Sequence, residues 1–377
     1  MIDALILAPY YWTLKIRHAL YDKGVKKSRE AEVPTICVGN VTVGGTGKTP
    51  HTEMILRILL SSEEYKGKNI AVLSLGYKRK SKGFQNVTLD GSALLYGDEP
   101  MQIKKKFPGV TVAVCKDRVL GCRFLCHPEE IEDSRKGRKC KDRNFPPADI
   151  IILDDAYQYR KLRSKASILL VNYNRPVHKD HLMPLGKLRD LPSRMGKADA
   201  VIVSKCPPYM EKSEKDAWAK NLGFKDYDIL SCSGTGPCGA RQYLFFSTLE
   251  YCQMEPVFVE SESRYLYSPR LILFSGIADD SNLVAYLSDK YKIVRHFNFP
   301  DHHTFSNADI ASLNSASNAC PTAVFATTEK DGSRIKDVKN MPERLRQRMF
   351  RVPVRAVFTS DLETSVFNDV IKSFIER

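Results

Sequence analysis

The 377-residue sequence lacks the marks of a membrane-spanning, secreted or zinc-binding protein. No run reaches the roughly 18 consecutive apolar residues that a membrane span needs, and no secretory signal pattern opens the chain. The 10 cysteines include no C-x-x-C pair, and no H-E-x-x-H pattern is present, so neither a structural zinc site nor a zinc peptidase is indicated. Scattered, unpaired cysteines are typical of a reducing compartment.

Two further absences narrow the classes of function. No segment matches the usual nucleic-acid-binding modules, and no complete N-K-x-D segment, which would read guanine, follows a strand. Positive charge, in contrast, is abundant: 58 Lys and Arg residues stand against 44 Asp and Glu residues, a formal net charge of +14. This excess favours an acidic partner such as nucleic acid, a phosphorylated small molecule or an anionic membrane face.

Short apolar runs alternate with helix-length stretches over about the first 200 residues. Such runs show little polar alternation, as expected for strands that are buried on both faces of a sheet. Strands that alternate with helices predict a mostly parallel sheet with helices on both faces, whose ligands bind beyond the carboxyl ends of the strands. The runs lie at 35–41, 69–75, 110–115, 149–155, 167–173 and 198–205.

Changes in composition and in apolar patterning divide the chain into three parts. After about residue 230, a Gly-rich link and a β-rich connector lead into further strand and helix patterns, which predict a smaller α/β domain over 231–377. The main domain is then expected over 28–230. Residues 1–27 predict an N-terminal helix in which aromatic residues precede cations, a combination that suits a membrane interface. Docking of this helix on the protein's own core is the alternative.

The stretch VTVGGTGKTP, residues 41–50, predicts a phosphate-binding loop between a strand and a helix. Glycines let backbone N–H groups curl around phosphate oxygens, and the helix N-terminus adds partial positive charge. We expect Lys48 to reach the terminal phosphates and Thr49 to ligate Mg²⁺. The strict pattern has glycine where this chain has Thr42. The fold class predicted is therefore α/β, P-loop NTPase-like; a glycine-rich turn without a ligand is the alternative.

Acidic residues follow one of the buried runs. Asp154 and Asp155 end the run at 149–155, which is the usual place of the Mg²⁺-organising carboxylate in phosphate-loop enzymes. Two adjacent buried carboxylates are costly unless a cation or hydrogen-bond donors satisfy them. The pattern therefore favours a metal site, with a turn or helix cap as the alternative.

Two other segments could supply a base. Asp98 begins a D-E-P segment, which by itself indicates only the start of a helix. His302 lies between Asp301 and His303, and the adjacent histidines beside a carboxylate suit a base unit or a set of metal ligands. Neither segment identifies an acceptor on its own.

Collinear segments across the chain resemble the tetraacyldisaccharide 4′-kinases, also called lipid A 4′-kinases. They cover most of the chain up to about residue 335, and the phosphate loop of this family has threonine at the position of Thr42. The matching segments, in order, are VGNVTVGGTGKTP, GYKRKSKGF, YGDEPMQI, CKDRVLG, DDAYQYRKL, PLGKLRD, VIVSK, SGIADDSNL, FPDHHTFS and TTEKDGSR.

The resemblance implies a kinase that uses ATP and Mg²⁺ to phosphorylate the 4′-hydroxyl of an acylated glucosamine disaccharide 1-phosphate. It implies Asp98 as the base on the sugar hydroxyl, supported by His302, with Asp155 also catalytic. Metal ligation falls to Asp154 and Thr49. The nucleotide-binding residues that it implies are Thr42, Gly44, Gly45, Thr46, Gly47, Lys48, Thr49, Arg118, Arg189 and Asp190.

A membrane-embedded anionic substrate gives the +14 charge and the aromatic N-terminus one shared explanation. The resemblance implies a monomer that acts peripherally at the cytoplasmic face of the bacterial inner membrane, in lipopolysaccharide assembly, with no nucleic-acid partner. Two positions depart from the family pattern, because Leu75 replaces an arginine and Asp190 replaces a glutamate. The competing hypothesis is a phosphate-loop GTPase or ATPase switch without a sugar acceptor.

Overall fold

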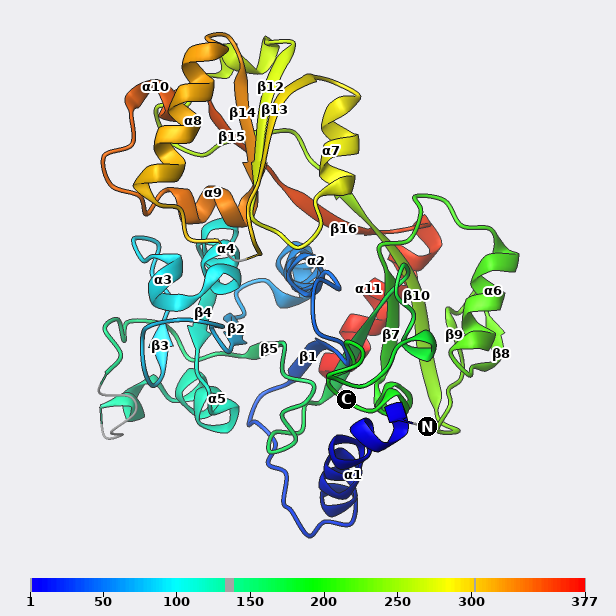
Figure 1. Ribbon diagram of the computed structural model, residues 1–377. Helices are drawn as coiled ribbons and strands as arrows, with labels where there is room; N and C mark the ends of the chain where they lie inside the picture. Colours follow the sequence, from blue (N-terminus) through cyan, green and yellow to red (C-terminus); the bar gives the residue numbers. More distant parts are fainter. Residues whose placement is uncertain (1, 133–138, 302, 377) are drawn as a thin grey trace.

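The computed structural model describes residues 2–132, 139–301 and 303–376, and two sheets organise this part of the chain (Figure 1). The larger sheet runs β3-β4-β2-β5-β1-β6-β7-β10-β9-β8, and β16 also pairs with β10. Its central strands are parallel and almost wholly buried, which explains their unalternating apolar sequences. These central strands are β1 (Thr35–Asn40), β2 (Ile70–Ser74), β4 (Thr111–Val114), β5 (Ile150–Asp154), β6 (Ala166–Asn172) and β7 (Ala200–Ser204).

Antiparallel strands close the two edges of the larger sheet. On one edge β3 pairs with β4, and on the other β10 joins β7 in parallel while β9 and β16 pair with it in antiparallel fashion. The edge strands are β3 (Gln85–Asn86), β8 (Lys225–Asp228), β9 (Ser233–Thr235), β10 (Arg241–Tyr251) and β16 (Val354–Phe358).

Helices cover both faces of the larger sheet, because alternate strand residues point to opposite sides. Cys37 of β1 joins one hydrophobic cluster, whereas its neighbours Ile36 and Val38 join the other. The helices over the first cluster are α1 (Ile2–Asp22), α5 (Arg118–Cys126) and α6 (Lys212–Asn221). Those over the second are α2 (Lys48–Ser61), α4 (Asp98–Lys106), which follows the short α3 (Ala93–Tyr96), and α11 (Asp361–Glu376).

The smaller sheet runs β11-β15-β14-β12-β13 and has its own core on each face. Its strands are β11 (Glu255–Pro256), β12 (Arg270–Ser275), β13 (Lys292–Asn298), β14 (Val324–Thr328) and β15 (Met349–Val352). One face is covered by α7 (Ser281–Ser288), and the other by α8 (Asn307–Ala319), α9 (Glu329–Ile335) and α10 (Glu343–Arg346).

The chain enters and leaves the smaller sheet at one place. It departs through β10 and returns through β16, and the Cys252 N–H donates to the Pro353 carbonyl at 2.8 Å just beyond this strand pair. After the return, α11 buries Phe367 and Phe374 against the larger sheet. Of the segment predicted as a C-terminal domain, 241–251 and 354–376 thus lie with the larger sheet.

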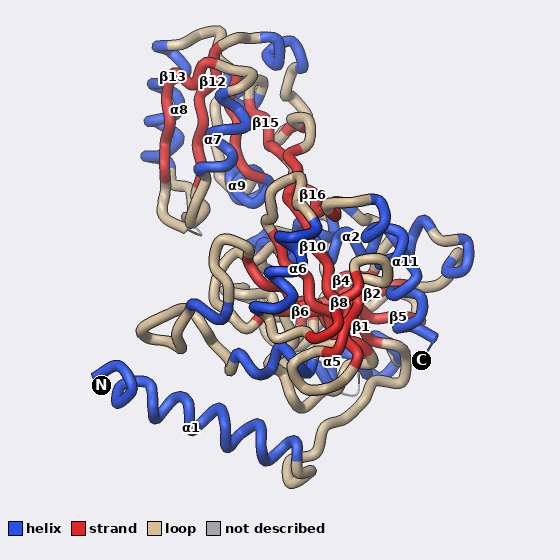
Figure 2. The backbone as a smooth tube through the Cα atoms, turned by 90° about the vertical axis from the view of Figure 1, so that its right-hand side faces the viewer, coloured by secondary structure: helices blue, strands red, loops and turns tan. Residues whose placement is uncertain are grey.

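Helix α1 lies along the outside of the larger sheet, on the far side of the molecule from the smaller one (Figure 2). Leu14 and His18 on its inner side are each 5% exposed. Trp12 and Ile16 on its outer side are 53% and 56% exposed. Among the described residues, no helix combines the length and the apolar character that a membrane crossing requires.

Candidate active site

The predicted phosphate loop joins β1 to α2. Gly47 is the N-cap of α2 at φ 81°, a left-handed conformation that glycine adopts without strain. Because Gly47 brings no capping side chain, the first N–H groups of the helix are left for an anion. The loop is held from outside, since Asn40 Nδ2 donates to Thr46 Oγ1 at 2.7 Å and Ser204 Oγ donates to the Thr46 carbonyl at 2.8 Å.

Thr42 lies beneath the loop. Its backbone forms an antiparallel bridge with Leu188, its side chain is only 6% exposed, and its Oγ1 accepts from Asn40 Nδ2 at 3.4 Å. Thr42 is therefore packed into the protein, and the positive φ of the loop occurs at Gly44 and Gly47 instead. The structure thus explains how the loop accommodates a residue other than glycine at this position.

A buried histidine braces the loop from the other side. His51 Nδ1 bonds the Gly47 carbonyl at 2.7 Å, and its Nε2 bonds Ser247 Oγ on β10 at 2.8 Å. Burial lowers the pKa of His51 to about 4, so this ring is neutral at physiological pH. The sequence interpretation did not single out His51, because one histidine in an amphipathic helix carries no local signal.

The two carboxylates at the end of β5 lie in different electrostatic environments. Asp154 is buried and accepts from Ser74 Oγ at 3.2 Å and from Thr52 Oγ1 at 3.4 Å. Burial, reinforced by the charges of Asp155 and Glu99, raises the pKa of Asp154 to about 6. Hydroxyl donors surround this carboxylate, but none of the ion pairs found among the described residues includes it.

Asp155 is instead neutralised by two cations. Lys48 Nζ lies 3.7 Å from its Oδ2, and the Arg189 guanidinium forms a bidentate pair with it. Burial opposes ionisation, but Lys48 and Arg189 hold the pKa of Asp155 below its usual value. The protein thus keeps Asp155 ionised through two ion pairs, whereas Lys48 only partly offsets the effect of burial on Asp154.

The site fits a magnesium nucleotide by the chemistry of its donors. Asp154 and the buried Thr49 offer oxygen atoms, the ligands that Mg²⁺ prefers. Within the described ranges no group of three or more His, Cys, Asp or Glu side chains forms a complete metal cage. That is the expected arrangement for Mg²⁺, which usually takes one or two carboxylates and completes its shell with phosphate and water oxygens.

Of three further predicted residues, Arg118 and Arg189 contact Asp155, whereas Asp190 does not. Arg118 is buried at the start of α5 and donates to the Asp155 carbonyl at 3.4 Å. Arg189 also donates to Asn40 Oδ1 at 2.6 Å, next to the loop. The Asp190 carboxylate bonds His18 Nε2 of α1 at 2.6 Å, and both side chains are buried. Asp190 thus contacts α1, whereas Arg189 contacts the carboxylate site.

Asp98, the predicted base, lies where α4 of the larger domain contacts α9 of the smaller one. Asp98 begins α4, and Arg334 of α9 binds its Oδ2 through Nη2 at 2.5 Å and through Nε at 3.1 Å. The next residue is held in the same way, because Lys330 Nζ lies 2.6 Å from Glu99 Oε1. The sequence interpretation missed Arg334 and Lys330 as site residues, although both belong to the TTEKDGSR segment that it matched.

The D-H-H segment is described only in part. His302 lies outside the described residues. His303 stacks on Phe299 at 4.6 Å between ring centroids and bonds Asp309 Oδ2 at 2.9 Å. Because Asp309 also takes part in the capping box of α8, His303 anchors the start of that helix.

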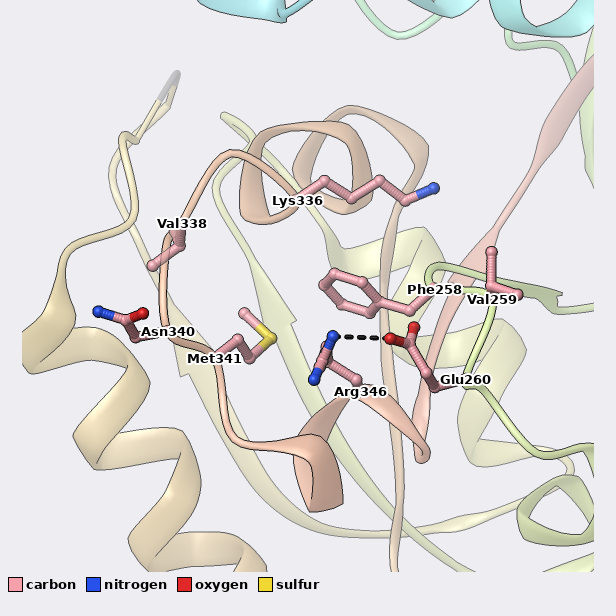
Figure 3. Close-up of a pocket in the computed structure, with 8 residues that line it drawn as sticks. All are labelled: Phe258, Val259, Glu260, Lys336, Val338, Asn340, Met341 and Arg346. Atoms are coloured by element: carbon pink, nitrogen blue, oxygen red, sulfur yellow. Dashed lines mark hydrogen bonds and ion pairs between the residues drawn. The ribbon is translucent and has the colours of Figure 1, made fainter. Parts of the chain in front are cut away.

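A separate cavity of about 590 Å³ opens in the smaller domain (Figure 3). The pair between Arg346 Nη1 and Glu260 Oε1, at 2.6 Å, lies in its wall. None of the predicted site residues lines it. The lining residues are Phe258, Val259, Glu260, Lys336, Val338, Asn340, Met341 and Arg346.

Comparisons with known proteins agree on one family. The family model described as tetraacyldisaccharide-1-P 4′-kinase matches residues 4–372. A tetraacyldisaccharide 4′-kinase of Phocaeicola vulgatus is 34% identical over 368 residues, which are 96% of this chain and 91% of that protein. One of Flavobacterium johnsoniae is 36% identical and covers 91% of this chain and 88% of its own length. The crystal structure of LpxK from Aquifex aeolicus in complex with ATP is similar over 100% of both chains, with a TM-score of 0.68 and 26% identity.

Proposed function

The chain belongs to the tetraacyldisaccharide-1-P 4′-kinase family, and we propose that the site built around its phosphate loop carries out that family's reaction. The protein is an ATP-dependent kinase of lipid A synthesis. This confirms the predicted activity, fold class and phosphate donor, and it excludes the hypothesis of a switch without a sugar acceptor. The acceptor is the 4′-hydroxyl of an acylated glucosamine disaccharide 1-phosphate. The observation that carries this assignment is the placement of Lys48 beside the Asp154–Asp155 pair at the mouth of the loop.

The loop and its cations bind and orient the phosphates. Backbone N–H groups of Gly44, Gly45 and Gly47 would bind phosphate oxygens, and Lys48, which lies 3.7 Å from Asp155, would contact the terminal phosphates. Arg118 and Arg189 add fixed positive charge on the carboxylate side. Asp154 and Thr49 are the residues that would hold Mg²⁺, which neutralises phosphate charge when bound. Positioning and charge neutralisation are the main catalytic contributions in this chemistry.

Asp98 acts as the base on the acceptor. The sugar oxygen forms a bond to the γ-phosphorus, its proton passes to the Asp98 carboxylate, and the bond from the γ-phosphorus to the ADP oxygen breaks. Arg334 forms an ion pair with Asp98 and fixes its orientation. We retain His302 as the group that supports this base, on the resemblance alone.

Helix α1 is proposed as the contact with the membrane that carries the substrate. Its outer side exposes Trp12 and Ile16, and Lys15 lies 4.9 Å from the Trp12 ring centroid. Exposed aromatic and apolar groups beside a cation suit an interface with anionic headgroups. We propose that the enzyme acts as a monomer, peripherally, at the cytoplasmic face of the bacterial inner membrane.

The test is a transfer assay with the full chain. The protein is incubated with Mg-ATP and the acylated disaccharide 1-phosphate in detergent micelles, and the phosphorylated product is measured. Lys48→Ala and Asp98→Ala should each lower the rate on the order of 100-fold or more, whereas the exposed-surface variant Lys220→Ala should match the wild type. Absence of transfer by the wild type, or undiminished transfer by Lys48→Ala and Asp98→Ala, would refute the assignment.

A further inference from the structure

Lys205 lies beside the phosphate loop on an element that the reaction outlined above does not use. It directly follows β7, which is separated from β1 by β6 in the larger sheet. The preceding residue, Ser204, is hydrogen-bonded to the loop through the Thr46 carbonyl. A Cβ atom built on Gly45 would lie 3.8 Å from Lys205 Nζ, so the ammonium group reaches the glycine turn itself.

The backbone conformation of Lys205 costs free energy that a purely solvent-exposed lysine would have no reason to incur. Its backbone lies at φ 61°, in the left-handed region that residues other than glycine seldom occupy. Burial lowers the pKa of its ammonium group, and the charge that opposes this effect is that of Asp279 in the smaller domain. In the part of the chain that the structure describes, no hydrogen bond or ion pair includes Lys205.

A partly desolvated cation without a close partner is unfavourable unless a ligand supplies the countercharge. Lys48, which belongs to the loop itself, lies 3.7 Å from Asp155, so its charge is partly neutralised within the protein. Among the ion pairs of the described residues none includes Lys205, on which Asp279 acts only from a distance, and the nearby Gly45 has only backbone groups to offer. The space around this ammonium group is therefore suited to an anionic group that approaches the loop.

We propose that Lys205 is a nucleotide-binding residue whose ammonium group contacts the bound nucleoside di- or triphosphate at the Gly44–Gly45 turn, as a second cation beside Lys48. This inference rests on the proposed function, because it needs the loop to bind ATP. It adds a contact from β7, on the side of the loop opposite to β5 in the strand order. The contact is made in the ground state and should therefore act on affinity more than on turnover.

Direct binding of ATP and ADP, measured by titration calorimetry on the full chain without the lipid acceptor, tests this role. Lys205→Gly and Lys205→Met should each lower the affinity for ATP and for ADP at least tenfold. The affinities of Lys205→Arg should stay within threefold of those of the wild type. In the transfer assay the KM for ATP should rise similarly, with kcat and the KM for the lipid changed less than threefold. Lys220→Met, which removes one exposed positive charge from α6, is the matched control and should bind as the wild type does.

Lys205→Gly also separates binding from folding. Glycine adopts the left-handed conformation freely, so the thermal midpoint of this variant should be equal to or above that of the wild type. Weakened nucleotide binding with an undiminished midpoint supports the proposal. ATP affinity within twofold of the wild type for both Lys205→Gly and Lys205→Met overturns it and leaves the kinase assignment standing. A wild type that binds no ATP would refute both.

Discussion

At the scale of single residues, Asp154 and Asp155 show how one site divides charge between neighbours. Arg189 and Lys48 keep Asp155 ionised, while burial raises the pKa of Asp154 to about 6. A carboxyl group whose pKa is higher in the folded than in the unfolded state stabilises the fold at low pH. That contribution is complete below pH about 4 and is lost as the pH rises through about 6.

Asp154→Asn should therefore change the pH dependence of stability in a definite direction. The shift in the Asp154 pKa from 3.8 to about 6 corresponds to about 3 kcal/mol. Without nucleotide and metal, the wild type should lose stability of that order between pH 4 and pH 8, and Asp154→Asn should lose much less. Unfolding by urea at several pH values measures this, with the exposed Asp226→Asn as control. Parallel profiles for wild type and Asp154→Asn would contradict the prediction.

Arg334 offers a second prediction at this scale. Arg334→Gln removes the guanidinium that holds the Asp98 carboxylate through Nη2 and Nε. We expect kcat/KM to fall about 10- to 100-fold, because the base is misoriented.

Two variants sharpen that experiment. Arg334→Lys keeps one positive charge and should restore part of the rate. Arg344→Gln removes an exposed guanidinium from α10 in the same domain and should leave the rate unchanged. An undiminished kcat/KM in Arg334→Gln would show that Arg334 does not position the base.

At the scale of elements, α1 docks on the protein with one side and exposes the other, and contact of the exposed side with a membrane stays a prediction. Its inner side docks on the protein, where Tyr10 Oη donates to the Arg189 carbonyl at 2.8 Å and His18 bonds Asp190. Its outer side exposes Trp12 and Ile16. The shorter Asp190, which departs from the family pattern, therefore has a partner on α1. One helix thus connects the surface proposed to contact the membrane with the residue next to Arg189.

Variants on the two sides of α1 should have separate effects on liposome binding and on phosphate transfer. Trp12→Ala combined with Ile16→Ala should weaken binding to anionic liposomes about tenfold or more, because apolar area is lost from the interface. Transfer to a detergent-dispersed acceptor should be unchanged. His18→Ala should do the reverse, since it leaves Asp190 buried without its partner. Co-sedimentation with liposomes and the micelle assay measure the two effects, and a double variant that binds liposomes normally would return α1 to a docking role only.

Sequence patterns located the loop and both carboxylates because these features are local. A strand, a glycine-rich turn and a helix occupy adjacent residues, so VTVGGTGKTP and the end of the run at 149–155 could be placed without tertiary information. The Arg334–Asp98 pair joins residues 236 positions apart, and no spacing rule predicts such a contact. For His51 and Lys205, burial and backbone conformation carry the signal, and both depend on the folded chain.

At the scale of the whole molecule, the boundary predicted at about residue 230 shows the same limit. Apolar periodicity identifies β10, β16 and α11 as elements but does not say which sheet they join. Their partners are set by pairing between distant segments, as in the register that places Ser247 opposite Phe358. The smaller sheet is therefore inserted within the larger domain, between Tyr251 and Val354.

Removal of α11 should consequently damage the nucleotide-binding part of the molecule. Phe367 and Phe374 are wholly buried against the larger sheet, and the loss of each large aromatic side chain costs about 3–5 kcal/mol. A chain ending at residue 360 should lose hydrogen-exchange protection in β1 and β5 before β12 and β14. The double variant Ser373→Ala and Lys372→Ala, which alters partly exposed positions of the same helix, is the control and should keep full protection. Equal loss in both sheets would contradict this order.

The position of α11 also bears on synthesis. A ribosome delivers the chain from the N-terminus, so the phosphate loop emerges before β16 and α11 do. The strands of the smaller domain lie between Glu255 and Val352, so that domain can fold while the larger one still lacks β16 and α11. The nucleotide site should therefore become competent only after α11 has emerged from the ribosome and packed on the larger sheet.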